Sequence, residues 1–109
     1  MPSRYEPCGL SQMIAMRYGC VPIARATGGL VDTVQHISRN VDHGTGFLFD
    51  RPYPSVFSKT LERSLRLYQE PEAWRRIQTN GMTTDFSWEK SARKYIDVYL
   101  ELLASRIKV

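Results

Sequence analysis

A chain of 109 residues is expected to hold one domain, because a chain of this size buries roughly 60–70% of its unfolded surface and has room for one core. Its content of 42% hydrophobic and 24% charged residues is typical of a folded globular protein and excludes a disordered chain. The net charge of +4 is spread along the chain without a basic block, so no nucleic-acid partner is predicted.

The sequence also predicts no membrane partner and no metal. No apolar run approaches the roughly 18 residues that a membrane span needs, and the start has neither the charged region nor the apolar stretch of a signal peptide. The two cysteines, Cys8 and Cys20, stand at either end of a predicted helix, about 16 Å apart along its axis, which is too far for a disulfide. With two scattered histidines beside them, they form no zinc ligand set.

Residues 3–12 place a carboxylate, a proline turn and a glycine directly ahead of an apolar helix predicted over 10–18. A helix N-terminus leaves about four N–H groups unpaired and carries a positive partial charge, so it offers donors to an anion. The donors here belong to Gly9, Leu10 and Ser11. Glu6 offers a fixed acceptor for hydroxyls. Two interpretations stay open: a site for a phosphate or sugar, or a tight turn from strand to helix.

A second glycine turn follows a short strand. Gly19 ends the helix 10–18, which is apolar nearly all round and is expected to be covered on several sides. Residues 21–24 are an apolar run typical of a buried parallel strand. Thr27-Gly28-Gly29 then lies at the carboxyl end of this strand, where open parallel sheets bind ligands. A helix followed by such a strand is half of a βαβ unit and predicts an α/β fold.

The middle of the chain predicts one loop and one strand. Residues 35–45 are polar and hold both histidines, His36 and His43, which we interpret as solvated loop side chains; a ligand role for either is the alternative. Residues 47–49, Phe-Leu-Phe, predict a short strand that Asp50 and the prolines after it end.

The final part, about 54–106, predicts three helices. The first covers about 54–70, with these positions at helical spacing: Phe57, Leu61, Ser64, Leu65 and Tyr68. The second begins at Pro71 and is stopped by Asn80-Gly81. The third opens at Ser87, a good N-cap, and carries a stripe that we interpret as core: Ala92, Tyr95, Ile96, Tyr99, Leu102 and Leu103.

This architecture has too few strands to be complete. A parallel sheet covered on both faces needs four or more strands, and the sequence supplies about two with a stub at Met1-Pro2-Ser3. Residues 1–109 are therefore expected to be a partial domain. The unpaired edge of strand 21–24 and the uncovered part of helix 10–18 predict that the isolated chain forms a homodimer, by strand pairing or exchange of its last helix, or is marginally stable as a monomer.

Several stretches, in order, resemble one family. They are residues 3–13 (Ser-Arg-Tyr-Glu-Pro-Cys-Gly-Leu-Ser-Gln-Met), 16–22, 27–34 (Thr-Gly-Gly-Leu-Val-Asp-Thr-Val), 44–49 and 85–92. Together they closely resemble the C-terminal domain of the bacterial glycogen synthases and plant starch synthases, the ADP-glucose-dependent glucan synthases of glycosyltransferase family 5. The resemblance implies the C-terminal portion of the donor-binding, Rossmann-like domain of a two-domain GT-B glycosyltransferase, with an N-terminal domain as missing partner.

The resemblance also implies an activity. Family members transfer glucose from ADP-glucose to the non-reducing end of an α-1,4-glucan with retention, without a further cofactor, in the bacterial cytoplasm or the plastid stroma. By resemblance Glu6 is the catalytic residue, which contacts the donor glucose or stabilises the charged transition state. The implied donor-binding residues are Cys8, Gly9, Leu10, Ser11, Thr27, Gly28 and Gly29. The family's other pyrophosphate-binding groups lie upstream of Met1, so the isolated chain is expected to be inactive.

Three positions qualify the resemblance. Cys8 is interpreted as a small residue packed behind the turn, and a reactive thiol at the helix N-terminus is the alternative. Ser11 stands where many relatives have threonine. Ile14 stands where the wider retaining glycosyltransferases carry a second glutamate, which the glycogen synthase branch commonly lacks. Two other functions stay open: a non-catalytic carbohydrate-binding or interaction module, and part of another nucleotide-sugar glycosyltransferase. Glycine and phenylalanine usually follow the glutamate in the latter, so the Glu-Pro-Cys-Gly stretch disfavours it.

Overall fold

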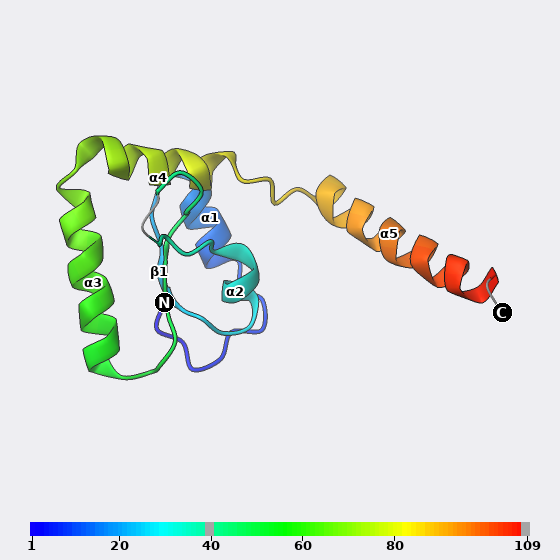
Figure 1. The fold of residues 1–109 in the computed structure, drawn as a ribbon, viewed down its shortest axis with the longest axis horizontal. Helices are drawn as coiled ribbons and strands as arrows, with labels where there is room; N and C mark the ends of the chain where they lie inside the picture. Colours follow the sequence, from blue (N-terminus) through cyan, green and yellow to red (C-terminus); the bar gives the residue numbers. More distant parts are fainter. Residues whose placement is uncertain (39–40, 108–109) are drawn as a thin grey trace.

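The computed structural model describes residues 1–38 and 41–107 and shows the predicted α/β fold (Figure 1). Within these residues the chain forms two strands, β1 (Ile23–Arg25) and β2 (Phe47–Phe49). The helices in the same residues are α1 (Ser11–Arg17), α2 (Gly29–Thr33), α3 (Pro54–Tyr68), α4 (Pro71–Thr83) and α5 (Trp88–Ile107). Residues 39 and 40, inside the expected loop 35–45, lie outside the described part.

The two strands pair in parallel, with Ile23 opposite Phe47. Met1 lies along the other edge of β1, where its α-amino group donates to the carbonyl of Ile23 at 2.8 Å and its own carbonyl accepts from the N–H of Arg25 at 3.0 Å. The strand predicted over 21–24 begins two residues later, at Ile23, and ends at Arg25. The prediction of an unpaired edge is wrong here, because the stub at Met1 occupies it.

The sheet lies between α3 on one side and α1 with α2 on the other, and α4 crosses one end (Figure 1). The buried side chains of Ile37, Phe47 and Ile77 form one cluster of the core. Trp74 of α4 stacks on Phe47 with ring centroids 6.5 Å apart, and Tyr68 meets Trp74 edge-on at 5.2 Å. These contacts hold α4 against the sheet.

Prolines set the starts of two helices. Pro54 and Pro71 stand in the first turn of α3 and α4, where the missing N–H has no intrahelical acceptor and the fixed φ suits a helix. Both starts are as predicted. The predicted stop of α4 at Asn80-Gly81 is wrong, because α4 continues to Thr83. Gly81 serves packing instead: a Cβ there would lie 3.3 Å from the Cβ of Met16 on α1, so glycine allows the two helices to cross closely.

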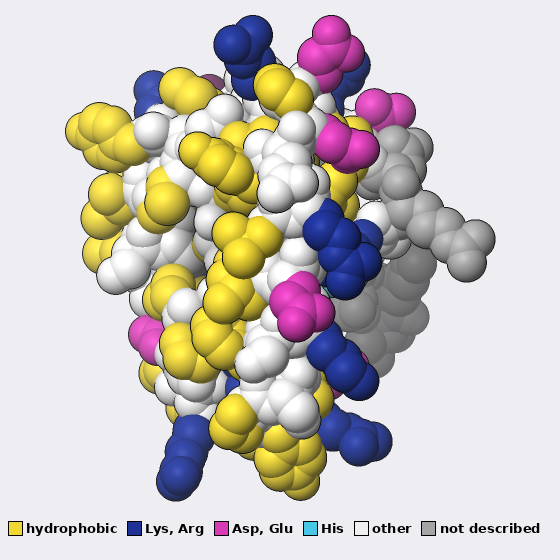
Figure 2. All heavy atoms as spheres, turned by 90° about the vertical axis from the view of Figure 1, so that its left-hand side faces the viewer, with side chains coloured by type: hydrophobic (Ala, Val, Ile, Leu, Met, Phe, Trp, Pro, Cys, Tyr) yellow, Lys and Arg dark blue, Asp and Glu magenta, His cyan; other side chains and the backbone are white. Residues whose placement is uncertain are grey.

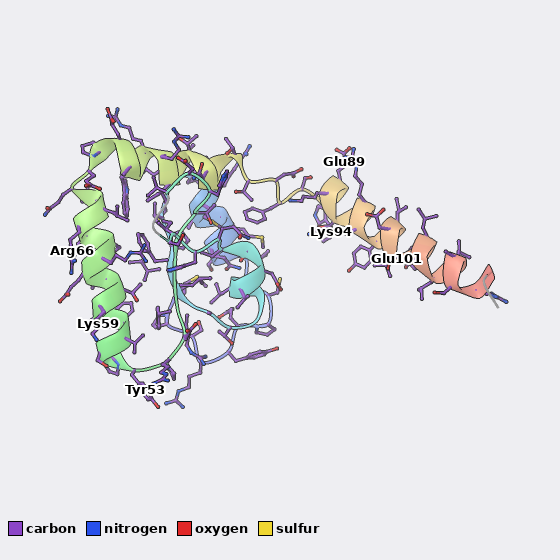
Figure 3. The ribbon with its side chains drawn as sticks, in the orientation of Figure 1. Tyr53, Lys59, Arg66, Glu89, Lys94 and Glu101 are labelled. Atoms are coloured by element: carbon purple, nitrogen blue, oxygen red, sulfur yellow. The ribbon has the colours of Figure 1, made fainter. Side chains whose placement is uncertain are left out.

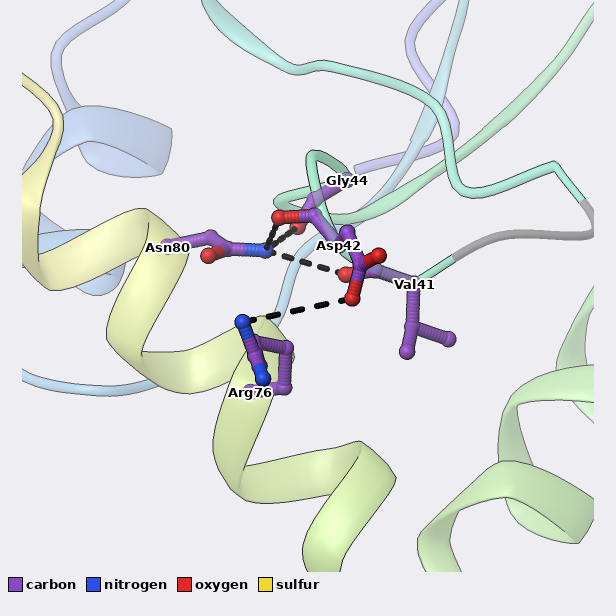
Figure 4. Close-up of polar contacts among 5 residues, drawn as sticks. All are labelled: Val41, Asp42, Gly44, Arg76 and Asn80. Atoms are coloured by element: carbon purple, nitrogen blue, oxygen red, sulfur yellow. Dashed lines mark hydrogen bonds and ion pairs between the residues drawn. The ribbon is translucent and has the colours of Figure 1, made fainter.

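Asn80 has a separate role within α4. Its Nδ2 donates to the backbone carbonyls of Val41 at 3.0 Å, Asp42 at 3.0 Å and Gly44 at 2.9 Å (Figure 4). One turn earlier, the guanidinium of Arg76 lies 3.9 Å from the carboxylate of Asp42. Helix α4 thus holds the loop that leads into β2.

Helix α5 extends away from the rest of the chain (Figures 1 and 3). Ser87 caps it as predicted, since its Oγ accepts the N–H of Lys90 at 3.3 Å. Arg93 pairs with Glu89 one turn apart at 2.9 Å. The cap contributes about 1 kcal/mol to the helix and the ion pair roughly 0.2–0.5 kcal/mol.

The predicted apolar faces of α3 and α5 are largely exposed. The stripe of α5 was expected to be core, and this expectation is wrong: Tyr95 is 64% and Leu102 62% exposed. On α3, Leu65 and Tyr68 are 54% and 62% exposed, and hydrophobic side chains gather along its outward side in Figure 2. The buried position of α3 is Ser64. On α3 the predicted positions Phe57 and Ser64 do face the core, and the ring of Phe57 lies 5.6 Å from that of Phe49 in β2, whereas Leu65 turns outward. For α5 the period is correct and the expected burial is not.

Candidate functional site

The two predicted glycine turns lie against each other beyond the carboxyl end of β1. The N–H of Gly29 donates to the carbonyl of Glu6 at 2.8 Å. Gly28 has a φ of +50°, and a Cβ there would lie 1.8 Å from the same carbonyl oxygen, so only glycine fits. A Cβ on Gly29 would lie 2.4 Å from the carbonyl oxygen of Cys8. The turns therefore touch through their backbones.

Glu6 is fixed in this contact through both its backbone and its side chain. The hydroxyl of Ser3 donates to carboxylate oxygen Oε2 at 3.1 Å, and the side chain is half-buried. The other carboxylate oxygen, Oε1, lies 3.1 Å from the point that a Cβ on Gly9 would occupy. Gly9 itself has a φ of +71°. The result is an oriented carboxylate beside the start of α1.

Leu10 and Ser11 lead into α1, which begins with a bond from the N–H of Ile14 to the carbonyl of Leu10 at 3.0 Å. The N–H groups of a first helical turn have no intrahelical acceptor, so they point out of the helix toward the loop. The side chain of Leu10 is 64% exposed and lines a groove of about 620 Å³ between α1 and residues 83–87. The polar group that Leu10 can offer a ligand at the loop is therefore its backbone N–H.

Cys8 differs from the prediction. Its side chain is exposed, not packed behind the turn, and both Cys8 and Cys20 are free thiols as expected. The atoms that pack behind the turn belong to the backbone, because the carbonyl of Cys8 accepts from Nε2 of Gln12 at 3.0 Å. A donor-binding role for Cys8 would use this backbone or the exposed thiol.

Gln12 and Thr33, which the sequence analysis did not single out, connect the two turns. Gln12 is 0% exposed, and its Nε2 donates to the carbonyl of Cys8, to the carbonyl of Gly9 at 3.1 Å and to Oγ1 of Thr33 at 3.1 Å. The Thr33 hydroxyl in turn donates to the carbonyl of Gly29 at 2.8 Å. A chain of hydrogen bonds thus runs from the first turn to the second.

The orientation of the Gln12 amide carries a cost. The carbonyls of Cys8 and Gly9 can only accept, and the Thr33 hydroxyl already donates to Gly29, so the amide nitrogen faces all three. The buried Oε1 then accepts no hydrogen bond from any of the described residues. A buried acceptor without a donor costs about 1–3 kcal/mol. The sequence did contain a signal, because a polar residue inside an apolar helix needs buried partners.

Arg25, the last residue of β1, fixes the loop that carries Glu6. Its Nη1 donates to the carbonyls of Ser3, at 3.3 Å, and Arg4, and its Nε donates to the carbonyl of Asp50 at 3.1 Å. Because Asp50 directly follows β2, the guanidinium ties the loop to the carboxyl ends of both strands. Nothing in the local sequence around Arg25 pointed to this role.

His36 lies away from the turns and is exposed to solvent, as predicted, but its ring also has a bond to the sheet that the prediction did not include. Its Nδ1 accepts the N–H of Leu48 in β2 at 2.9 Å. Burial, and then the nearby charge of Arg63, lower the pKa of its ring, while the charge of Asp50 partly opposes this shift. In residues 1–38 and 41–107 no cluster of His, Cys, Asp and Glu could hold a metal ion. None of the helices described here is long and apolar enough to cross a membrane.

Comparison with known proteins identifies the family. The model of the family Glycosyl transferases group 1 matches residues 1–81. The chain is 50% identical over 105 residues to the glycogen synthase of Thermotoga petrophila, and 49% identical over 104 residues to that of Gloeobacter violaceus. Each alignment covers 95% of this chain. The chain spans only 22% and 23% of the length of these relatives.

Two solved structures share the fold. The catalytic domain of starch synthase IV from Arabidopsis thaliana, bound to ADP and acarbose, has a TM-score of 0.77 and 43% identity, covering 92% of this chain and 21% of that one. The sucrose-phosphate synthase of Thermosynechococcus elongatus has a TM-score of 0.63 and 32% identity, covering 95% of this chain and 25% of that one. These likenesses confirm the predicted Rossmann-like portion of a GT-B fold. The chain belongs to the family of glycosyl transferases group 1, within which it resembles the C-terminal part of the glycogen and starch synthases.

Proposed function

We propose that this chain is the donor-binding part of a glucan synthase, which transfers glucose from ADP-glucose to the non-reducing end of an α-1,4-glucan with retention. The contact of the two turns carries the proposal: the N–H of Gly29 bonds the backbone carbonyl of Glu6 at 2.8 Å, and the Ser3 hydroxyl bonds the Glu6 carboxylate at 3.1 Å, beside the start of α1. The identity of 50% to a glycogen synthase supports the reaction class. The ADP and acarbose bound to the similar starch synthase support a nucleotide-sugar donor and a glucan acceptor.

Each site residue has a proposed role. The Glu6 carboxylate accepts hydrogen bonds from the donor glucose, or it stabilises the positive charge that develops at the anomeric carbon of that glucose in the transition state. The N–H groups of Leu10 and Ser11, with the Ser11 hydroxyl, donate to the pyrophosphate. Cys8 and Gly9 line the sugar through their backbone. The stretch Thr27-Gly28-Gly29 supports this loop from behind. No cofactor besides the donor substrate is part of the proposal.

The second wall of the active-site cleft is proposed to come from an N-terminal domain. The relatives are several times longer than this chain, which leaves ample sequence for such a domain. Helix α5 offers the surface for it, because Tyr99 and Leu103 on its apolar stripe are 63% and 55% exposed. An apolar helix face of this kind gains stability when another domain covers it.

A chimeric enzyme tests the proposal. In it, this chain replaces the matching part of the Thermotoga petrophila glycogen synthase, which is 50% identical. We expect the chimera to transfer glucose from ADP-glucose to glycogen. Glu6→Ala should lower kcat by about 10²–10³-fold with a smaller change in the donor KM, because the group acts mainly in the transition state.

Glu62→Ala is the matched control, since it removes a carboxylate of α3 whose side chain is 67% exposed. This variant should keep its kcat. An inactive chimera, or a Glu6→Ala variant with unchanged kcat, would contradict the proposal. Binding of glycogen by the isolated chain combined with an inactive chimera would favour the non-catalytic carbohydrate-binding module instead.

A further inference from the structure

Hydrogen bonds join the two turns into a closed ring. From Glu6 the ring runs through the N–H of Gly29, at 2.8 Å, and on through the carbonyl of Gly29 to the hydroxyl of Thr33, also at 2.8 Å. It continues to Nε2 of Gln12 at 3.1 Å and returns to the loop at the carbonyl of Cys8 at 3.0 Å. Gln12 is the member that closes the ring, because its amide contacts both sides.

The position of Gln12 is not explained by packing alone. Met16, one turn later on the same buried face of α1, is also 0% exposed and is apolar. An apolar residue therefore fills this face equally well at a position that makes no hydrogen bond to the loop. At position 12 the helix instead carries an amide whose two hydrogens go to the loop and to α2, while its Oε1 stays unpaired among the described residues.

We infer that Gln12 is a positioning residue for the transfer reaction, an inference that rests on the proposed function. It sets the backbone of Cys8 and Gly9 and, through them, the carboxylate of Glu6. Gly9 transmits the effect: the point where its Cβ would stand lies 2.9 Å from Oε1 of Gln12 and 3.1 Å from Oε1 of Glu6. The two side chains thus approach the same glycine, and a shift of one changes the space of the other.

Gln12→Met in the chimera described above tests this role. Methionine has a similar length and volume but no donor, so the buried space stays filled while the three bonds are lost. A displacement of about 1 Å in a reacting group costs about 10²-fold in rate. We expect kcat to fall by about this factor while the donor KM changes less than about threefold, because the N–H groups of α1 still meet the pyrophosphate.

Two further variants sharpen the test. Gln12→Glu keeps the shape but turns the donor into an acceptor that repels the carbonyls, so its kcat should fall at least as far. Gln78→Met is the matched control: Nε2 of Gln78 donates to the carbonyl of Gly19 at 2.9 Å, at the far end of α1 from the loop. This control should lose stability but keep its kcat. Melting curves of all variants set an assay temperature at which each is folded.

The outcomes separate the inference from the proposed function. Gln12 variants that are destabilised like Gln78→Met but keep their kcat would overturn the inference and leave Gln12 as a structural residue. If Gln12→Met fails to fold, Gln12→Glu decides by the same criterion. An inactive chimera with the unchanged chain would overturn the proposed function, and the inference would fall with it.

Discussion

Replacing Asn80 by leucine removes the side chain that holds the loop before β2. Its amide has two hydrogens for the three carbonyls of Val41, Asp42 and Gly44, at 3.0, 3.0 and 2.9 Å. Two hydrogen bonds contribute about 1–3 kcal/mol net. Gly44 is buried, so water does not readily replace the donor to its carbonyl, which adds about 1 kcal/mol. We therefore expect the free energy of unfolding to fall by about 2–4 kcal/mol.

Urea unfolding followed by circular dichroism measures this change, and for a chain of this size it corresponds to a melting temperature lower by about 10 °C or more. Asn80→Asp should be worse, because a carboxylate would face the three carbonyls. Arg75→Leu, at an exposed position of the same helix, is the control and should change the free energy by less than about 0.5 kcal/mol. An Asn80→Leu variant as stable as this control would refute the reasoning.

Acid should destabilise the chain partly through His36, whose pKa is lowered in the folded state by burial and then by Arg63. The unfolded chain then binds the proton more readily than the folded chain. The stability that neutral His36 contributes is therefore complete above its ordinary pKa of 6.5 and is lost as the pH falls through its lower pKa in the folded chain. His36→Asn, whose amide oxygen can accept the same bond, should flatten the melting temperature between about pH 7 and 5, whereas His43→Asn should leave the profile unchanged. Gly28→Ala should lower the melting temperature sharply, because its Cβ would lie 1.8 Å from a carbonyl oxygen; calorimetry showing an unchanged transition would contradict the contact. The isolated chain should show no glucosyl transfer and should either dimerise or be only marginally stable as a monomer, because the apolar stripe of α5 is exposed. Light scattering that finds a compact monomer with a sharp, concentration-independent transition would count against this.

Local chemistry made several element boundaries predictable. Proline fixes its own φ and lacks its own donor, so Pro54 and Pro71 marked the starts of α3 and α4 without any tertiary information. Ser87 marked the start of α5 for a similar reason, because its cap bond spans only three residues. The strand at 47–49 matched its prediction residue for residue. Each of these signals lies within one turn or one strand.

Long-range contacts were out of reach of the same reasoning. The bond between Gln12 and Thr33 joins residues 21 positions apart, and α2, with five residues, is too short for a helical period to show. The exposed stripe of α5 has the same spacing as a core stripe, so the sequence could not tell which surface covers it. The structure brings the two predicted turns together, while the roles of Glu6 and its neighbours stay predictions.

The backbone contact between the two turns has a consequence for how this site can change in evolution. The side chain of Cys8 takes no part in it and is exposed, so a substitution there alters the lining of the loop without altering its path. If the loop binds the donor as proposed, such side chains can change one at a time without moving the backbone. Gly28 and Gly29 cannot be replaced in this way, because a Cβ on either would clash with the backbone carbonyl of Glu6 or Cys8. The loop thus combines a backbone frame that requires glycine with side chains that can be replaced.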